Sequence, residues 1–229
     1  LGYVGIDNQG LSGLELQYDK YLTGKSGAIK YFSDAKGNKL NLSDIYVEPQ
    51  DGMNLSLTID LDIQKSLERE LDNVVDMFSP DMALAIVMNP NNGEILGMAS
   101  RPDYDPNNYQ DYSEEVLSRN LPIWASYEPG STFKIITTSA AVEENVVDLQ
   151  KDHFYDSGSV TVDGAVLRCW KAGGHGEQTM LQVLQNSCNP GFVKMGQLLG
   201  KEKLFSYIDK FGFGEKTGVD LNGEGKGII

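Results

Sequence analysis

The sequence has little cysteine, little basic charge and no long apolar run, and each shortage excludes a class of protein. Two Cys among 229 residues are too few for a disulfide framework. Only 19 Lys and Arg stand against 33 Asp and Glu, and the net charge of −14 disfavours a nucleic-acid partner or attachment to anionic lipid. No stretch approaches the roughly 18 consecutive apolar residues of a membrane span. The chain starts without Met or a charged leader, so we expect a piece of a longer protein, whose location the missing signals do not reveal.

The composition that remains is that of a globular protein, with 40% hydrophobic and 23% charged residues. Residues 1–54 are rich in Gly and have too few apolar side chains for a deep core. They predict short strands and loops, with a hairpin that begins at 28–32 and turns near Gly37 and Asn38. Longer periodic segments begin near residue 55.

From residue 55 onward the hydrophobic pattern predicts both strands and helices. The expected strands are 55–59, 82–88, 94–99 and the two arms of a hairpin that turns at Asp163 and Gly164. The expected helices run from residue 60 to 78, from 131 to 142, and onward from 179. The middle helix is apolar on nearly every side, which predicts that it is buried.

The most informative residues are Ser131 and Lys134 in the segment EPGSTFK, residues 128–134. The Pro-Gly pair ends the preceding structure and puts Ser131 in the first turn of a helix, with Lys134 one turn away on the same face. A Lys at the buried start of an apolar helix has a lowered pKa, so its neutral amine can take the proton of the Ser hydroxyl. The helix N-terminus adds donors for an oxyanion. The pattern predicts a serine nucleophile that needs no His, although a capping Ser beside an exposed Lys has the same spacing.

In its context this segment resembles the acylation motif of penicillin-binding proteins. Their second motif, Ser-x-Asn, is matched by Ser187, Cys188 and Asn189. The segments around both motifs resemble class B members of the family, of the sporulation or division type: GIDNQGLSGLE at 5–15, LTID at 57–60, NGEILGMA at 92–99 and RPDYDPN at 101–107. The resemblance covers essentially the whole chain.

The resemblance implies an α+β fold, the penicillin-binding/β-lactamase-like transpeptidase domain with an antiparallel sheet and helices, here truncated at its C-terminus. Residues 1–54 would be the C-terminal part of a pedestal or dimerisation-like domain, and residues 55–229 the N-terminal part of the transpeptidase domain. Lys216, Thr217 and Gly218 spell the third family motif. They stand, however, where the family commonly has a Thr-Gly-hydrophobic-Asp-Leu loop, so we expect the catalytic Lys-Thr-Gly further downstream.

The activity that the resemblance implies is that of a D,D-transpeptidase that cross-links peptidoglycan. Ser131 would attack the penultimate D-Ala of a stem peptide ending in D-Ala-D-Ala, and Lys134 would act as base. Ser187 would relay a proton to the leaving amine, and Asn189 would hold Lys134 and the substrate amide. β-Lactams should acylate Ser131. The resemblance also implies a glycan-polymerase partner, a single N-terminal membrane anchor outside this chain, and a catalytic domain on the outer face of the cell membrane.

Two other functions share the first motif. A β-lactamase needs a base that activates water for deacylation, but Glu202 and Glu215, which follow the second motif, have Lys neighbours and are typical of solvated positions. A non-catalytic β-lactam sensor would be acylated stably without turning over peptide. Both functions stay open as alternatives at this point.

Cys169 and Cys188 allow three interpretations: zinc ligands, free thiols, or a disulfide, which is permitted outside the cytoplasmic membrane, where the family acts. The hairpin at 163–164 makes Asp156 a same-face diagonal neighbour of Cys169. His175 lies in a Gly-rich loop that can turn inward, and the following helix returns the chain toward the hairpin. The residues that predict a structural, tetrahedral zinc site are Asp156, Cys169, His175 and Cys188, with His153 as a spare on the opposite strand face.

Overall fold

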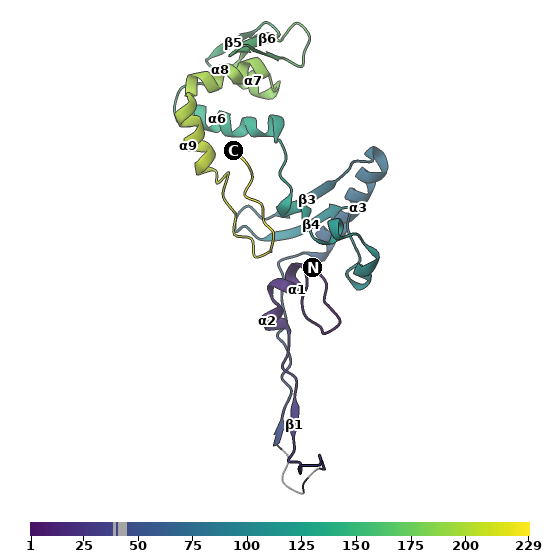
Figure 1. Cartoon of the computed structure of the whole chain (residues 1–229). Helices are drawn as coiled ribbons and strands as arrows, with labels where there is room; N and C mark the ends of the chain where they lie inside the picture. The colour runs from purple at the N-terminus through teal and green to yellow at the C-terminus, as the bar shows by residue number, and fades with distance from the viewer. Residues whose placement is uncertain (39, 41–44) are drawn as a thin grey trace. The chain divides into compact units, whose positions relative to one another are not determined.

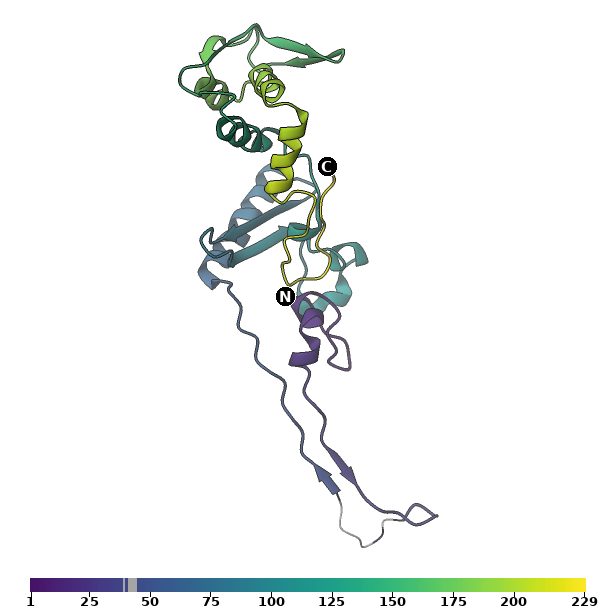
Figure 2. The same ribbon diagram turned by 90° about the vertical axis from the view of Figure 1, so that its left-hand side faces the viewer.

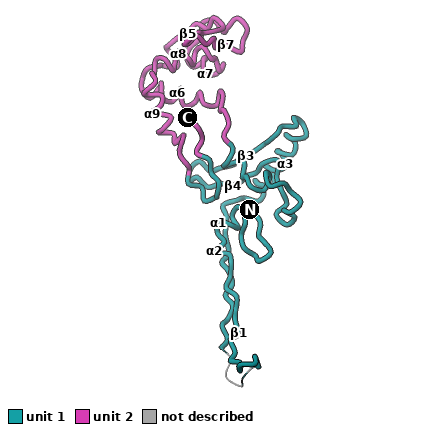
Figure 3. Tube along the Cα trace, viewed as in Figure 1, with its two compact units in different colours: residues 1–125, 218–225 teal, residues 126–217, 226–229 magenta. Residues whose placement is uncertain are grey.

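The computed structural model describes residues 1–38, 40 and 45–229. The chain divides into two compact units, residues 1–125 with 218–225 and residues 126–217 with 226–229 (Figure 3). Every strand pairing in these described residues is antiparallel and two-stranded, so the fold is α+β, as the family resemblance implies.

The first unit contains α1 (Gly13–Gln17), α2 (Asp19–Leu22), β1 (Ala28–Lys30), β2 (Ile45–Val47), α3 (Leu61–Phe78), β3 (Ala83–Met88), β4 (Ile95–Arg101), the 3-10 helix η1 (Pro106–Asp111), α4 (Glu114–Leu117) and α5 (Leu121–Trp124). The second unit contains the 3-10 helix η2 (Gly130–Phe133), α6 (Lys134–Glu143), β5 (His153–Asp156), β6 (Ser159–Val162), β7 (Ala165–Arg168), β8 (Gly176–Thr179), α7 (Met180–Gln185), α8 (Asn189–Leu199) and α9 (Lys201–Lys210).

The predicted hairpin in the first 54 residues is present. Ala28 of β1 pairs with Val47 of β2, and a bridge between Lys25 and Gln50 continues the pairing. Figure 2 shows the two segments running side by side toward this hairpin. Asp34 holds a turn beyond β1, because its carboxylate accepts hydrogen bonds from two backbone N–H groups at 2.8 and 2.9 Å.

Helix α3 begins where the sequence predicts, because Asp60 caps it. The Asp60 carboxylate accepts hydrogen bonds from two backbone N–H groups of the first turn, at 2.9 and 3.0 Å, and such a cap stabilises a helix by about 1 kcal/mol. The buried face of α3 carries Leu67 and Leu71, which form a core cluster with Ala99 of β4. In Figure 1, α3 accordingly lies along the β3–β4 hairpin.

The β3–β4 hairpin is also joined to α3 by polar contacts. The Gln64 side chain bonds to the backbone of Met98 in both directions: its Oε1 accepts at 2.8 Å and its Nε2 donates at 2.9 Å. At the end of β4, Arg101 Nε lies 2.7 Å from the Asp72 carboxylate. Helix and hairpin are therefore held by directed bonds as well as by apolar burial.

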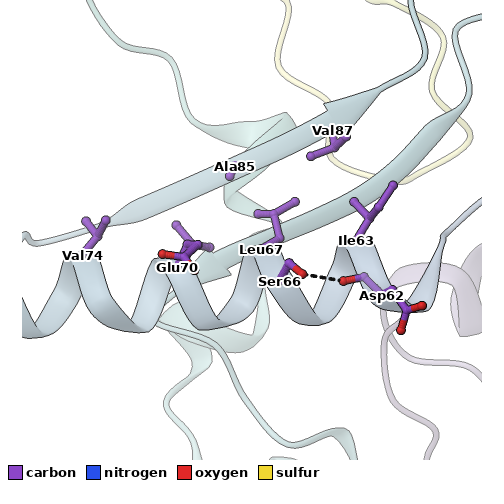
Figure 4. Close-up of a pocket in the computed structure, with 9 residues that line it drawn as sticks. Asp62, Ile63, Ser66, Leu67, Glu70, Val74, Ala85 and Val87 are labelled. Atoms are coloured by element: carbon purple, nitrogen blue, oxygen red, sulfur yellow. Dashed lines mark hydrogen bonds between the residues drawn. The ribbon is translucent and has the colours of Figure 1, made fainter.

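One apolar surface between α3 and β3 is open. Ile63, Leu67 and Val74 of the helix, together with Ala85 and Val87 of β3, line a groove of about 610 Å³ (Figure 4). The groove belongs to the first unit and contains no residue of the two sequence motifs.

The predicted strand at 55–59 is wrong, because the structure has no strand there. Thr58 Oγ1 donates to the Ile95 carbonyl at 2.6 Å, and the Asp60 N–H donates to the Leu96 carbonyl at 2.8 Å. Alternating apolar and polar residues favour an extended backbone, but a strand also needs a partner that continues the hydrogen-bond ladder.

The second unit is built around α6, α8 and α9. Ala140, Leu199 and Tyr207 form one core cluster between these helices. The sequence predicts that α6 is buried on nearly every side, but Ile135 and Val142 are 62% and 41% exposed, so that prediction is wrong. The buried residues of α6 are Ile136, Thr137, Thr138, Ala140 and Ala141.

A hairpin and a second antiparallel strand pair complete the second unit. Strands β6 and β7 turn at Asp163 and Gly164 with Val162 opposite Ala165, the register that the sequence predicts. Strands β5 and β8 form a second pair, which brings the Gly-rich loop before β8 next to Asp156 at the end of β5. None of the helices in the two units, over the residues described, is long and apolar enough to cross a membrane.

Candidate active site

Ser131 lies on the turn that leads into α6. Gly130 has a φ of +55°, in the left-handed region that favours Gly, and it starts the short 3-10 helix that carries Ser131. Lys134 follows three residues later as the first residue of α6. Ser131 is exposed, so a substrate can reach its hydroxyl.

Lys134 connects the first motif to the second. Its Nζ donates hydrogen bonds to the Ser187 carbonyl at 2.8 Å, to Ser187 Oγ at 2.9 Å and to Asn189 Oδ1 at 2.6 Å. These bonds use the three N–H donors of the ammonium group. The Nζ also lies 5.0 Å from the centre of the Phe192 ring, where a cation is attracted to the aromatic face.

The charge state of Lys134 is perturbed by its surroundings. Burial lowers the pKa of Lys134, and Cys188 and Cys169 nearby oppose this effect only in part. Neutral Lys134 therefore costs less free energy than a neutral surface Lys does. In the described part of the chain, no hydrogen bond joins Lys134 Nζ to Ser131 Oγ, and the three hydrogen bonds of the amine go to the second motif.

The second motif is the C-terminal cap of α7. The Ser187 N–H donates to the Leu184 carbonyl and the Cys188 N–H to the Val183 carbonyl, both at 3.0 Å, which is the hydrogen-bond pattern of a Schellman motif. Ser187 occupies the left-handed position of that motif with a φ of 48°, where Gly is usual. The motif also accounts for the burial of Cys188, since the residue at its position packs back onto the helix.

Asn189 begins α8 immediately after this cap and is held at both ends of its amide. Its Oδ1 accepts from Lys134, and its Nδ2 donates to the Arg168 carbonyl at 3.0 Å. The structure therefore brings Lys134, Ser187 and Asn189 into direct contact, with Ser131 one turn before the Lys.

The four residues predicted as zinc ligands also come together. One potential ligand atom of each of Asp156, Cys169, His175 and Cys188 lies within 4.8 Å of the others. Both Cys are free thiols. Asp156 Oδ2 accepts from Cys188 Sγ at 3.3 Å and lies 3.1 Å from His175 Nδ1, which in turn lies 3.2 Å from Cys169 Sγ. The spare residue, His153, is exposed and bonds only locally, to the Lys151 carbonyl.

Backbone donors complete the surroundings of Asp156. The Gly158 N–H donates to its Oδ1 at 2.8 Å, and the His175 N–H donates to its Oδ2 at 3.0 Å. Burial raises the pKa of this carboxyl, but the hydrogen bonds from Gly158, Cys169, His175 and Cys188 outweigh burial and hold the pKa far below its usual range. Burial, with the hydrogen bond to Asp156, raises the pKa of Cys188 to about 11.

Two contacts of this site carry no signal in the sequence. Asn189 donates a hydrogen bond to the Arg168 carbonyl. Because every residue has a backbone carbonyl, the residue type does not indicate this contact. Trp170 donates from Nε1 to the Asn186 carbonyl at 2.7 Å, beside the second motif. Lys216 and Thr217, by contrast, lie in an irregular segment after α9, outside any strand.

Comparison with known families and proteins identifies the family to which the chain belongs. The model of the "Penicillin-binding Protein dimerisation domain" matches residues 1–57, and that of the "Penicillin binding protein transpeptidase domain" matches residues 83–229. Stage V sporulation protein D of Bacillus subtilis (strain 168) is 60% identical over 230 residues, which cover 100% of this chain and 36% of that protein. Peptidoglycan D,D-transpeptidase FtsI of Escherichia coli (strain K12) is 31% identical over 229 residues, 100% of this chain and 38% of that protein.

Solved structures give the same result for the fold. Penicillin Binding Protein 2X from Streptococcus thermophilus matches with a TM-score of 0.82 and 26% identity over 99% of this chain and 34% of its own. Penicillin binding protein 3 from Mycobacterium tuberculosis matches with a TM-score of 0.83 and 26% identity over 100% of this chain and 47% of its own. The predicted penicillin-binding transpeptidase fold is therefore confirmed, and the chain spans little more than a third of the two curated relatives.

The prediction of a zinc cofactor is wrong. The predicted residues do meet, but the homologues of the chain are penicillin-binding proteins, which need no zinc cofactor. The geometry gives the reason: the carboxylate accepts from Gly158, His175 and Cys188, so the cluster is satisfied by its own hydrogen bonds. The residue spacing predicts that Asp, Cys and His lie close together. It does not predict that backbone N–H groups occupy the acceptor positions of the carboxylate.

Proposed function

The chain belongs to the penicillin-binding protein transpeptidase family, and on that premise we propose that it is part of a serine D,D-transpeptidase, which cross-links peptidoglycan stem peptides through an acyl-enzyme. The observation that carries the proposal is the contact of Lys134 Nζ with Ser187 Oγ and Asn189 Oδ1, one turn from an exposed Ser131. The 60% identity to stage V sporulation protein D favours a role in sporulation.

In the proposed reaction, Ser131 Oγ attacks the carbonyl of the penultimate D-Ala of a stem peptide. Lys134 takes the hydroxyl proton, and its lowered pKa reduces the cost of the neutral amine that this step needs. The bond to the terminal D-Ala breaks, and that residue leaves as an amine. An amine of a neighbouring stem peptide then attacks the acyl carbonyl and forms the amide bond of the cross-link. The ester bond to Ser131 Oγ breaks, and the proton that the amine loses returns to that oxygen.

Ser187 and Asn189 have different parts in this scheme. Ser187 Oγ lies 2.9 Å from Lys134 Nζ, within reach to pass the abstracted proton toward the leaving amine. Asn189 binds Lys134 through Oδ1 and Arg168 through Nδ2, so we assign it the orientation of Lys134. The Ser131 N–H supplies one oxyanion donor, and we place the second on a later strand of the longer protein, together with the catalytic Lys-Thr-Gly.

The organisation and surroundings of the protein are part of the same proposal. We keep the boundary predicted at residue 54 between the pedestal domain and the transpeptidase domain, which the dimerisation-domain match over residues 1–57 supports. The ligands are a stem peptide ending in D-Ala-D-Ala and β-lactams, which mimic that end. We further propose a location at the outer face of the cell membrane with an N-terminal anchor, and a glycan polymerase as partner.

The test is mass spectrometry of the full-length protein after incubation with a penicillin. We expect one penicilloyl adduct on the peptide that carries Ser131, and no adduct in Ser131→Ala. An adduct that survives this substitution contradicts the assignment. Incubation with a D-Ala-D-Ala ester separates the related functions: a transpeptidase transfers the acyl group to an amine, whereas a β-lactam sensor forms the adduct without turning over the ester, and a β-lactamase rapidly hydrolyses the adduct.

A further inference from the structure

We propose that Asp156 is a positioning residue of this site, which acts through Cys188 to hold Ser187 and Asn189 against Lys134. The inference rests on the proposed function, because it concerns the same second motif. Asp156 itself contacts none of the groups that react in that scheme.

The first observation is the burial of the Asp156 carboxylate, which is 0% exposed. A buried carboxylate is costly unless it is fully hydrogen-bonded. Here Gly158 and His175 supply backbone donors, and Cys188 donates its thiol hydrogen to Oδ2 at 3.3 Å. The carboxylate is therefore fixed by the β5–β8 strand pair and the loop before β8, and it offers Cys188 a fixed acceptor.

The second observation is the backbone conformation of Ser187. A left-handed φ of 48° is unfavourable for a residue with a Cβ, so the surrounding structure must hold it. Two backbone bonds to α7 and the anchoring of the next residue, Cys188, do so. If Cys188 is released from Asp156, its backbone can shift, and the Ser187 hydroxyl and carbonyl shift with it.

The third observation is a second connection from Asp156 to the site. Asp156 contacts His175, and His175 Nδ1 lies 3.2 Å from Cys169 Sγ. Cys169 directly follows Arg168, whose carbonyl accepts from Asn189 Nδ2. Asn189 is therefore fixed from two sides, by the preceding Cys188 and by the Arg168 carbonyl. Both sides are connected to the Asp156 carboxylate, the first directly and the second through His175 and Cys169. A displacement of about 1 Å at reacting groups can cost as much as a hundredfold in rate, so this support affects catalysis.

The experiment uses the full-length protein in the presence of a reductant, so that both Cys stay thiols. Acylation by a fluorescent penicillin is measured over a range of concentrations, which separates the maximal rate from the dissociation constant of the non-covalent complex. In Asp156→Asn an NH2 group replaces an acceptor oxygen. We expect the maximal rate to fall about tenfold, or about 1.4 kcal/mol, with the dissociation constant nearly unchanged.

Two variants of Cys188 test the contact even if Asp156→Asn does not fold. Cys188→Ser keeps a donor for Asp156 and should keep the rate close to that of the unsubstituted protein. Cys188→Ala removes the donor and should lose about tenfold. Both substitutions break the same contact, the hydrogen bond between Cys188 and Asp156. The double variant, Asp156→Asn with Cys188→Ala, should therefore also lose about tenfold in acylation rate, whereas two independent effects would lose about a hundredfold.

Val147→Ala is the matched control. Val147 is buried in the same core cluster as Cys188, but it is not part of the second motif. It should lower the melting temperature while the acylation rate below that temperature stays unchanged. The inference is overturned if Val147→Ala slows acylation as much as Asp156→Asn, if Cys188→Ser and Cys188→Ala have equal rates, or if the two losses multiply. An unsubstituted protein that forms no adduct at all contradicts the proposed function, and with it this inference.

Discussion

Ser187→Gly should be more stable than Ser187→Ala. At most positions the order is the reverse, because Gly loses more conformational freedom on folding than Ala does. Both substitutions remove the hydroxyl, so they differ only in the Cβ atom. At a φ of 48° a Cβ costs about 1–2 kcal/mol. Against this, Gly has the greater freedom in the unfolded chain, which disfavours it by about 0.4–1 kcal/mol. About 1 kcal/mol then remains in favour of Ser187→Gly.

The assay is thermal unfolding of the two variants under identical conditions. A difference of about 1 kcal/mol corresponds to a melting temperature about 2–4 °C higher for Ser187→Gly in a domain of this size. Acylation by a penicillin should fall equally in both variants, because both lack the hydroxyl of the proposed proton relay.

Ser139 provides a matched control inside α6. Ser139 has an ordinary helical backbone, in which Gly has no advantage over a residue with a Cβ atom. Ser139→Gly should therefore be less stable than Ser139→Ala by about 1 kcal/mol. A Ser187→Gly variant that is no more stable than Ser187→Ala would refute the assignment of Ser187 to the left-handed position of a helix cap.

Three further changes have defined outcomes. Lys134→Arg should reduce the acylation rate by a factor of about 10²–10⁴, because Arg keeps the charge but cannot act as a base, and a near-normal rate would exclude Lys134 as the base. In the unsubstituted protein, acylation should rise with pH as Lys134 loses its proton, and since burial lowers the pKa of Lys134, the rise should come below the ordinary range of Lys. Lys216→Ala should leave acylation largely intact if the folded protein is recovered, and a loss as large as that of Lys134→Arg would place the third motif at Lys216. Residues 1–229 made alone should self-associate in light scattering through the apolar groove between α3 and β3, and Val74→Asp should reduce this association; a protein that stays monomeric would show that the groove does not drive it.

The sequence predicted those parts of the structure whose signals are local. Asp60 caps α3 at the predicted residue, and the Asp163-Gly164 turn fixes the register of β6 and β7. The spacing of Ser131 and Lys134 predicts a serine nucleophile with its base, and the family resemblance adds Ser187 and Asn189. The structure brings the last three of these residues into contact.

What the sequence could not predict depends on partners distant in the chain. The segment at 55–59 alternates like a strand, but the hydrogen bonds that it and the next residue make to Ile95 and Leu96 of β4 do not continue into a ladder. Strand β8 is polar and pairs with β5, which is distant in the chain. The left-handed Ser187 stands where Gly would have indicated a helix end. The residue pattern predicts the cluster around Asp156. It does not predict the hydrogen bonds that the Gly158 and His175 N–H groups donate to the carboxylate, because every residue type except Pro has such a group.

Because the second motif is the end of α7, the lifetime of the catalytic arrangement depends on a very short helix. α7 has six residues, whereas isolated helices below about 12–15 residues are marginal in water. Its stability therefore comes mostly from the burial of Met180 and Val183 and from the capping box formed by Thr179 and Gln182. Fraying of this one helix would release Ser187 and Asn189 while the rest of the protein stays folded. Amide exchange at residues 183–188 should therefore report, at any temperature, on the fraction of the protein in which the second motif is in place.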